Sequence, residues 1–260
     1  NGADRPDFQD TRSEATSVAA KKKAAVRASA KKATGGKKSP RAGKKGVSGG
    51  MAPREFLERL MGTPSPSGYE SGIQDVVEAY VKPFADTILR DGIGNLIAGI
   101  NPDASPRVML AGHCDEIGLQ VNYIDDQGNL WLNAIGGVDL STYVGHRVHV
   151  HGEAGPVLGV IGRRAIHLQD PADRLKAPVL KSVWVDIGAK DRAAAEKLCA
   201  VGDAITVTVG MEPLSGDVFV ARAFDDRIGV YVVMEALRKL KEKGSKAAVF
   251  AVSTVEEEIG

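Results

Sequence analysis

Apolar residues follow a helical spacing in three stretches of the chain, 56–61, 73–81 and 228–243. Residues three and four positions apart share one face of a helix, so each stretch predicts an amphipathic helix with one buried side. The third stretch closes with a lysine-rich turn and Gly244, which is typical of a helix C-terminus.

Other apolar runs near the two ends of this region are short, as expected of strands. Residues 87–90 and 95–100 are separated by a glycine-containing turn and predict a hairpin. Residues 108–111 and 249–252 predict two buried strands, each of which runs into polar residues.

The middle of the chain has a different texture. Its short β-prone runs are punctuated by Gly, Pro and Asp, as in a small barrel or sandwich, and a single helical stretch near residues 193–198 interrupts them. We therefore expect an α/β fold in which residues 51–118 and 214–260 form one discontinuous domain and residues 119–213 form an inserted β-barrel domain. The six β-prone runs are 119–124, 130–132, 147–150, 157–161, 182–187 and 204–209.

Residues 1–50 predict a disordered basic tail, because they are rich in Ala, Lys, Gly and Ser and carry little apolar surface. They hold 13 Lys and Arg against 4 Asp and Glu, a charge of +9, whereas the rest of the chain carries −8. Clustered lysines can bind nucleic acid by counterion release. No aromatic residue is interleaved with them for base stacking, so a solvated tail, or sequence upstream of a start at Met51, is the favoured interpretation.

The sequence disfavours a membrane-spanning or exported protein, and it disfavours a fold held by disulfides or a zinc knuckle. No apolar run approaches the length of a membrane span and no signal peptide opens the sequence, so we expect a cytoplasmic protein without a membrane partner. Cys114 and Cys199 are too few for a disulfide framework and lack the spacing of a zinc knuckle. Both are expected to be reduced, structural thiols.

The first candidate chemistry lies at the end of the 108–111 run. A strand there would put His113 and Asp115 on one face and Cys114 on the other, which sets a metal ligand beside a carboxylate that can hold it. The alternative is a core strand that simply runs out into a polar loop.

Two further pairs of acidic residues favour the metal interpretation over a strand that runs out into a loop. Asp225 and Asp226 precede the third helix, and Glu257 and Glu258 follow the 249–252 strand. A dinuclear hydrolase needs a carboxylate that bridges two cations, terminal His and carboxylate ligands, and a base for the water. The aspartates could instead cap the helix, and the glutamates could form a solvated strand end. Their co-occurrence at the ends of three core elements favours a metal site.

Three motifs carry a family resemblance: Gly112–Gly118 (GHCDEIG), Phe224–Gly229 (FDDRIG) and Val255–Gly260 (VEEEIG). The chain resembles, from Met51 to Gly260, the tetrahedral aminopeptidases with two metal ions, a family that includes glutamyl and deblocking aminopeptidases and some members named endoglucanase. The resemblance implies a three-layer metallopeptidase-type catalytic domain with the inserted small β-barrel.

The resemblance also implies a role for each candidate residue. His113 would be a ligand of one metal ion and Asp115 the residue that orients it. Asp225 would be the bridging ligand, Glu257 the general base and Glu258 a further ligand. These assignments align the glutamates on the following Ile-Gly.

What the protein would do follows from the same resemblance. It implies two divalent ions, zinc or cobalt, removal of N-terminal residues from peptide substrates, and a homo-oligomer, a dodecamer built through the inserted domain. Glu256 stands where a glutamine is expected, and the family's remaining aspartate and histidine ligands would lie beyond Gly260. We therefore expect this chain alone to bind metal poorly and to be inactive. The rival hypotheses are another dinuclear amidohydrolase, a deacylase or carboxypeptidase, and a non-catalytic polyanion-binding protein.

Overall fold

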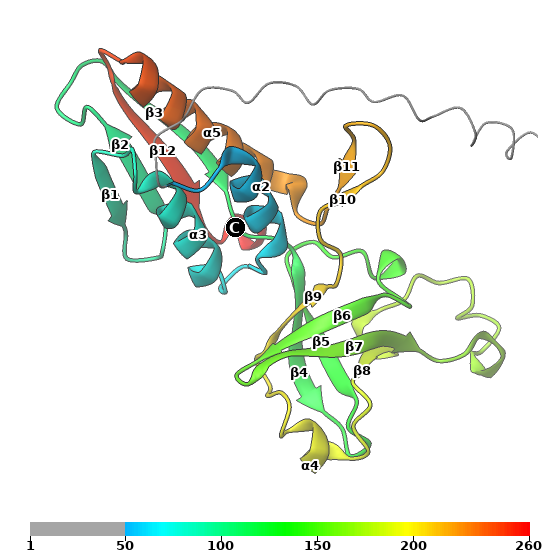
Figure 1. Ribbon diagram of the computed structural model, residues 1–260. Coiled ribbons are helices and arrows are strands. Elements are labelled where there is room, and N and C mark those ends of the chain that lie inside the picture. The colour runs from blue at the N-terminus through cyan, green and yellow to red at the C-terminus, as the bar shows by residue number, and fades with distance from the viewer. Residues whose placement is uncertain (1–49) are drawn as a thin grey trace, which may run out of the picture. The chain divides into compact units, whose positions relative to one another are not determined.

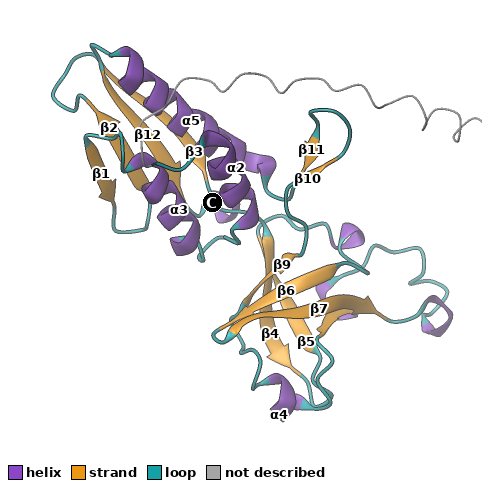
Figure 2. Ribbon diagram, viewed as in Figure 1, coloured by secondary structure: helices purple, strands orange, loops and turns teal. Residues whose placement is uncertain are grey.

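A four-stranded sheet with a layer of helices and a closed six-stranded barrel make up most of the described part of the chain (Figures 1 and 2). The structure is a computed structural model that describes residues 50–260. The predicted basic tail, apart from Gly50, lies outside the described residues. The mixed α/β class with a closed barrel confirms the predicted fold class.

The sheet has the order β1-β2-β12-β3. β1 and β2 form the predicted antiparallel hairpin, and β12 lies between β2, to which it is antiparallel, and β3, to which it is parallel. Strands from both sides of the barrel in the sequence therefore share one sheet. Their bounds are Thr87–Arg90 for β1, Leu96–Ile100 for β2, Arg107–His113 for β3 and Ala248–Thr254 for β12.

The three predicted helices are present as α2 (Pro53–Gly62), α3 (Ser71–Val81) and α5 (Phe224–Lys243). They cover one face of the sheet, and their apolar stripes form the core with Leu96, Ala98 and Ala251 of that face (Figure 1). Helices and sheet are thus two layers of the expected three. Within residues 50–260 no helix has the length and apolar character needed to cross a membrane.

The expectation of a buried strand at residues 108–111 is wrong. Val108 is 41% exposed and Met109 is 71% exposed. The physical reason is position, because β3 is an edge strand that pairs only with β12 among the residues that the structure describes. The 249–252 strand, by contrast, is central and buried, as predicted.

The barrel closes in the order β4-β5-β8-β7-β6-β9, and neighbouring strands are antiparallel. Alternate residues point inward and form a separate apolar core. Each predicted run corresponds to one strand, whereas the short β10–β11 hairpin was not predicted, since two-residue strands show no periodicity. The bounds are β4 Gly118–Ile124, β5 Leu130–Ile135, β6 Arg147–Gly152, β7 Gly155–Arg163, β8 Val183–Asp186, β9 Ala204–Val207, β10 Glu212–Pro213 and β11 Phe219–Val220, with the short helices α4 Arg192–Ala195, η1 Leu140–Thr142, η2 Ile166–Leu168, η3 Leu180–Ser182 and η4 Glu257–Ile259.

Both cysteines are free and buried, as predicted. Burial raises the pKa of Cys114 to about 12 and the pKa of Cys199 to about 11. Since the thiolate is the reactive form, these thiols are inert packing groups in the folded protein.

A fully buried arginine ties the elements around β3 together. Arg227, in the first turn of α5, donates hydrogen bonds to the Leu60 carbonyl (2.9 Å), the Cys114 carbonyl (3.3 Å) and the Ser65 Oγ (2.7 Å). It also forms an ion pair with Glu116, Nη2 to Oε1, at 2.6 Å. One side chain therefore joins α5, the end of α2, the loop after it and the segment after β3.

Replacing Arg227 with methionine should lower the free energy of unfolding by about 3–5 kcal/mol, because a buried charge pair would lose one member. Urea unfolding followed by circular dichroism measures the change. Arg59→Met is the matched control, since Arg59 pairs with Glu55 on the exposed face of α2 and such pairs contribute about 0–1 kcal/mol. Equal effects of the two substitutions would contradict a central role for Arg227.

Candidate active site

The candidate site lies where β3 and β12 end. The two strands are parallel neighbours with His113 paired to Thr254, so both carboxyl ends reach the same edge of the sheet. Ligand sites of α/β sheets form at that edge. α5 lies close beside this edge. A Cβ added to Gly112 would lie only 2.6 Å from the Val230 nitrogen of α5. The glycine thus allows the start of α5 to come next to His113.

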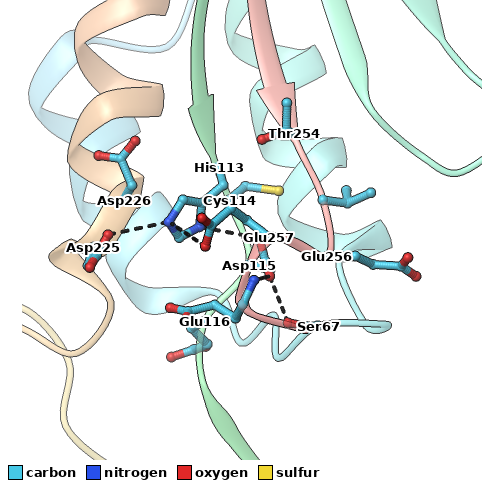
Figure 3. Close-up of polar contacts among 12 residues, drawn as sticks. Ser67, His113, Cys114, Asp115, Glu116, Asp225, Asp226, Thr254, Glu256 and Glu257 are labelled. Carbon is cyan, nitrogen blue, oxygen red and sulfur yellow. Dashed lines mark hydrogen bonds and ion pairs between the residues drawn. The ribbon is translucent and has the colours of Figure 1, made fainter. Parts of the chain in front are cut away.

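His113 is the centre of this group of side chains (Figure 3). It is 9% exposed. Its Nε2 lies 3.3 Å from Asp225 Oδ1 and 3.6 Å from Glu257 Oε2. Its Nδ1 lies 3.3 Å from Asp115 Oδ1. The imidazole therefore faces carboxylates on both of its nitrogens.

Asp115 is fully buried and is held from two sides. Its Oδ2 accepts hydrogen bonds from Ser67 Oγ at 2.7 Å and from the Glu258 backbone N–H at 3.0 Å. Its Oδ1 and the His113 Nδ1 lie 3.3 Å apart, are shielded from water, and have no hydrogen-bond partner within residues 50–260. This arrangement orients the imidazole so that Nε2 points toward Asp225 and Glu257.

The structure separates the two members of the aspartate pair (Figure 3). Asp226 Oδ1 accepts a hydrogen bond from the Gly229 N–H at 3.0 Å, which is the capping role weighed for this pair. Asp225 is exposed and faces His113 instead. The capping interpretation therefore holds for Asp226, whereas the ligand role of Asp225 stays a prediction.

The three glutamates also differ in their surroundings. Glu256 is exposed, and its backbone N–H donates to Glu70 Oε1 at 3.0 Å. Glu257, in η4, is the one nearest to the His113 ring. Burial raises the pKa of Glu258, opposed by His113, and the negative charges of Asp115, Asp225 and Glu257 raise it further. The repulsion among these carboxylates favours binding of a cation.

The donor atoms fit a divalent cation in type and, for one pair, in spacing. Two ligands of a tetrahedral zinc ion at about 2.0–2.1 Å lie about 3.3 Å apart, which matches the 3.3 Å between His113 Nε2 and Asp225 Oδ1. Within residues 50–260, however, no set of three or more His, Cys, Asp or Glu side chains is arranged to hold a metal ion. The described residues therefore bring together a histidine and a carboxylate of the kinds that bind divalent cations, without a complete set of ligands.

The sequence did not reveal two supporting groups. Ser67, which holds Asp115, lies 48 positions away in a loop whose Pro-Ser-Pro-Ser pattern indicates only a turn. Arg222, whose Nε lies 2.9 Å from Glu116 Oε2, stands between apolar residues and shows no periodicity. No local signal could have found either contact, because both are made across the fold.

Comparison with known proteins gives a consistent family match. A profile of the M42 glutamyl aminopeptidase family matches residues 94–260. The lysyl aminopeptidase of Pyrococcus furiosus is 36% identical over 213 residues, which are 81% of this chain and 61% of the relative.

Solved structures agree with this match. The TET aminopeptidase of a marine-sediment Thaumarchaeota archaeon has a TM-score of 0.77 and 34% identity over 80% of this chain and 60% of its own. The Pyrococcus horikoshii TET1 peptidase, which can assemble into a tetrahedron or a large octahedral shell, has a TM-score of 0.72 and 32% identity over 80% and 62%. The chain thus spans less than two thirds of the length of these relatives.

Ser67→Ala should destabilise the protein by about 1.5–3 kcal/mol, because a buried carboxylate would lose a hydrogen-bond donor. Urea unfolding measures this effect. Ser71→Ala is the matched control, since Ser71 is exposed at the start of α3 and a substitution there should stay within about 0.5 kcal/mol. A Ser67→Ala variant as stable as the control would mean that the hydrogen bond does not hold Asp115.

Proposed function

The chain belongs to the M42 glutamyl aminopeptidase family, and we propose that its protein hydrolyses the N-terminal peptide bond of peptides with the help of two divalent metal ions. One observation carries the proposal: His113 Nε2, Asp225 Oδ1 and Glu257 Oε2 converge where β3 and β12 end. A histidine oriented by a buried carboxylate is typical of a metal ligand.

Each of the candidate site residues has a distinct part in this proposal. His113, Asp225 and Glu258 would hold the ions, with Asp225 as the bridging ligand, and Asp115 keeps the imidazole turned toward the site. When bound, zinc or cobalt ions would polarise the scissile carbonyl and lower the pKa of the attacking water. Glu257 takes the proton of that water and delivers it to the leaving amine. A chain with these donors alone is expected to bind metal weakly and to be inactive.

Glu257→Gln should lower kcat by about 10²- to 10⁴-fold and leave the metal content nearly unchanged, because it removes a general base and not a ligand. The measurements are release of amino acids from unblocked peptides and metal content by mass spectrometry, both on the natural full-length protein loaded with zinc or cobalt. Glu256→Gln is the matched control, since Glu256 is exposed and contributes only its backbone.

Three other results would each contradict part of this assignment. Loss of metal from the Glu257→Gln variant would give that residue the ligand role. An active Glu257→Gln variant beside an inactive Glu256→Gln variant would shift the register by one residue. Hydrolysis of N-acylated amino acids, with none of unblocked peptides, would make the protein a deacylase.

We also propose that the protein forms a homo-oligomer, a dodecamer, through its barrel. Leu158 and Val160 are exposed on β7, and exposed apolar side chains on a barrel face suit an interface between copies. The expected result of light scattering on the full-length protein is a single species of twelve chains. Leu158→Glu together with Val160→Glu should dissociate it, whereas Tyr123→Glu on β4, which pairs with β5 and β9 and not with β7, should not.

Family membership leaves the preferred N-terminal residue open. The family carries the name glutamyl aminopeptidase, whereas the Pyrococcus furiosus relative is named a lysyl aminopeptidase. The preference must come from side chains beside the site.

A further inference from the structure

Side chains from three other parts of the fold hold the short segment that carries Glu257. The segment is residues 255–258, which lead from β12 into η4. Its N–H groups at positions 255, 256 and 258 donate, each over 3.0 Å, to Asn95 Oδ1, Glu70 Oε1 and Asp115 Oδ2 respectively. These acceptors precede β2, precede α3 and follow β3, so parts of the chain far away in sequence fix the segment.

Glu257 lies between two of these bound positions. Its Oε2 lies 3.6 Å from His113 Nε2, whereas the Glu256 side chain points away from the site (Figure 3). The N–H groups before and after Glu257 are bound to the buried carboxylates of Glu70 and Asp115. The direction of the Glu257 side chain therefore follows from the backbone that these hydrogen bonds fix.

The backbone of Glu256 has an unusual conformation. Its φ is 59° and its ψ is 23°, in the left-handed region that residues other than glycine rarely adopt. Such a conformation costs free energy and persists only where the surroundings impose it. The hydrogen bond from the Glu256 N–H to Glu70 opposes its relaxation. Relaxation would turn the next residue, Glu257, away from His113.

Glu70 is buried beside this segment. It is 6% exposed and stands at the N-terminal end of α3. Burial raises the pKa of Glu70, although the N–H groups of Gly68 and Glu256 favour its charged form. A neutral carboxyl keeps a carbonyl oxygen, so the hydrogen bond from the Glu256 N–H requires an acceptor at this place and not a charge.

We propose that Glu70 is a positioning residue, which fixes the general base Glu257 by holding the Glu256 N–H. This inference rests on the proposed function and adds to it a residue outside the three site motifs. Glu70 acts through the backbone of residues 256–258 and takes no part in proton transfer.

The test compares Glu70→Met, which removes the acceptor, with Glu70→Gln, which keeps a carbonyl oxygen at the same reach, in the metal-loaded full-length protein. With an unblocked peptide as substrate, Glu70→Met should lower kcat by about 10- to 100-fold and leave KM within about two-fold, since a misplaced base slows the chemical step more than binding. Glu70→Gln should lose at most about three-fold in kcat.

Two further variants support this comparison. Glu78→Met is the matched control and should leave kcat unchanged, because Glu78 lies on the same helix, is 41% exposed and pairs with Arg90. If Glu70→Met does not fold, Glu70→Asp takes its place. Its carboxylate keeps the charge but is one methylene shorter, so it withdraws from the Glu256 N–H.

The same substitution in a Glu257→Gln protein separates positioning from a general structural role. Glu70→Met should change the residual kcat of Glu257→Gln by less than about two-fold, because its effect acts through the base that is already missing. A further loss as large as in the wild type would overturn the inference. Equal losses for Glu70→Met and Glu70→Gln would also overturn it.

Hydrogen exchange gives a readout that does not depend on hydrolysis. Exchange of the amides at 255–258, measured by mass spectrometry of the peptides that contain them, should be at least about 10-fold faster in Glu70→Met and unchanged in Glu70→Gln and Glu78→Met. If the wild type cleaves no unblocked peptide, the proposed function fails by itself, and faster exchange still supports the hold of Glu70 on the segment of Glu257. Unchanged exchange in Glu70→Met would overturn the inference whether or not peptides are cleaved.

Discussion

The carboxylate of Glu116 is the point on which the arrangement of this protein depends. It accepts hydrogen bonds from Arg227 in α5, from Arg222 in the segment entering α5, and from the Ser65 N–H in the loop between α2 and α3. Glu116 is 3% exposed, so these partners replace its water. A buried carboxylate is stable only when so compensated, and removing a partner leaves a charge in a medium that solvates it poorly. The three segments are therefore fixed relative to one another.

The position of Glu116 in the chain gives this constraint its functional meaning. Glu116 follows Asp115 directly and lies two residues before β4, so one short segment carries the candidate ligand, its supporting carboxylate, the ion-pair centre and the entry to the barrel. The contacts that hold Glu116 in place therefore also hold His113. Arg222 and Arg227, which make these contacts, likewise fix the start of α5, which carries Asp225. The site and the barrel are thus positioned by one set of buried charges.

The candidate site itself shows the opposite balance of charge. Around His113 stand Asp115, Asp225, Glu257 and Glu258, and these carboxylates repel one another. Natural proteins keep such repulsion where function requires it. Buried arginines thus stabilise the surrounding framework, while the site concentrates negative charge suited to cations. Asp115 links the two regions, because Ser67 and the backbone of η4 hold it on one side and the imidazole lies on the other.

The sequence by itself determined the helices, the barrel strands, the central strand β12 and the motifs that carry His113, the aspartate pair and the glutamates, because burial on one face of an element imposes a local period. It left open whether the aspartates cap the helix or face the site, and whether the glutamates only form a solvated strand end. Only the tertiary structure showed that β3 is an exposed edge, that Asp225 faces His113 while Asp226 caps α5, and that Ser67, Arg222 and Arg227 complete the surroundings. Periodicity records that a residue is buried, but not which distant residue lies against it. Those contacts depend on pairing between segments up to 167 positions apart, which no local pattern encodes.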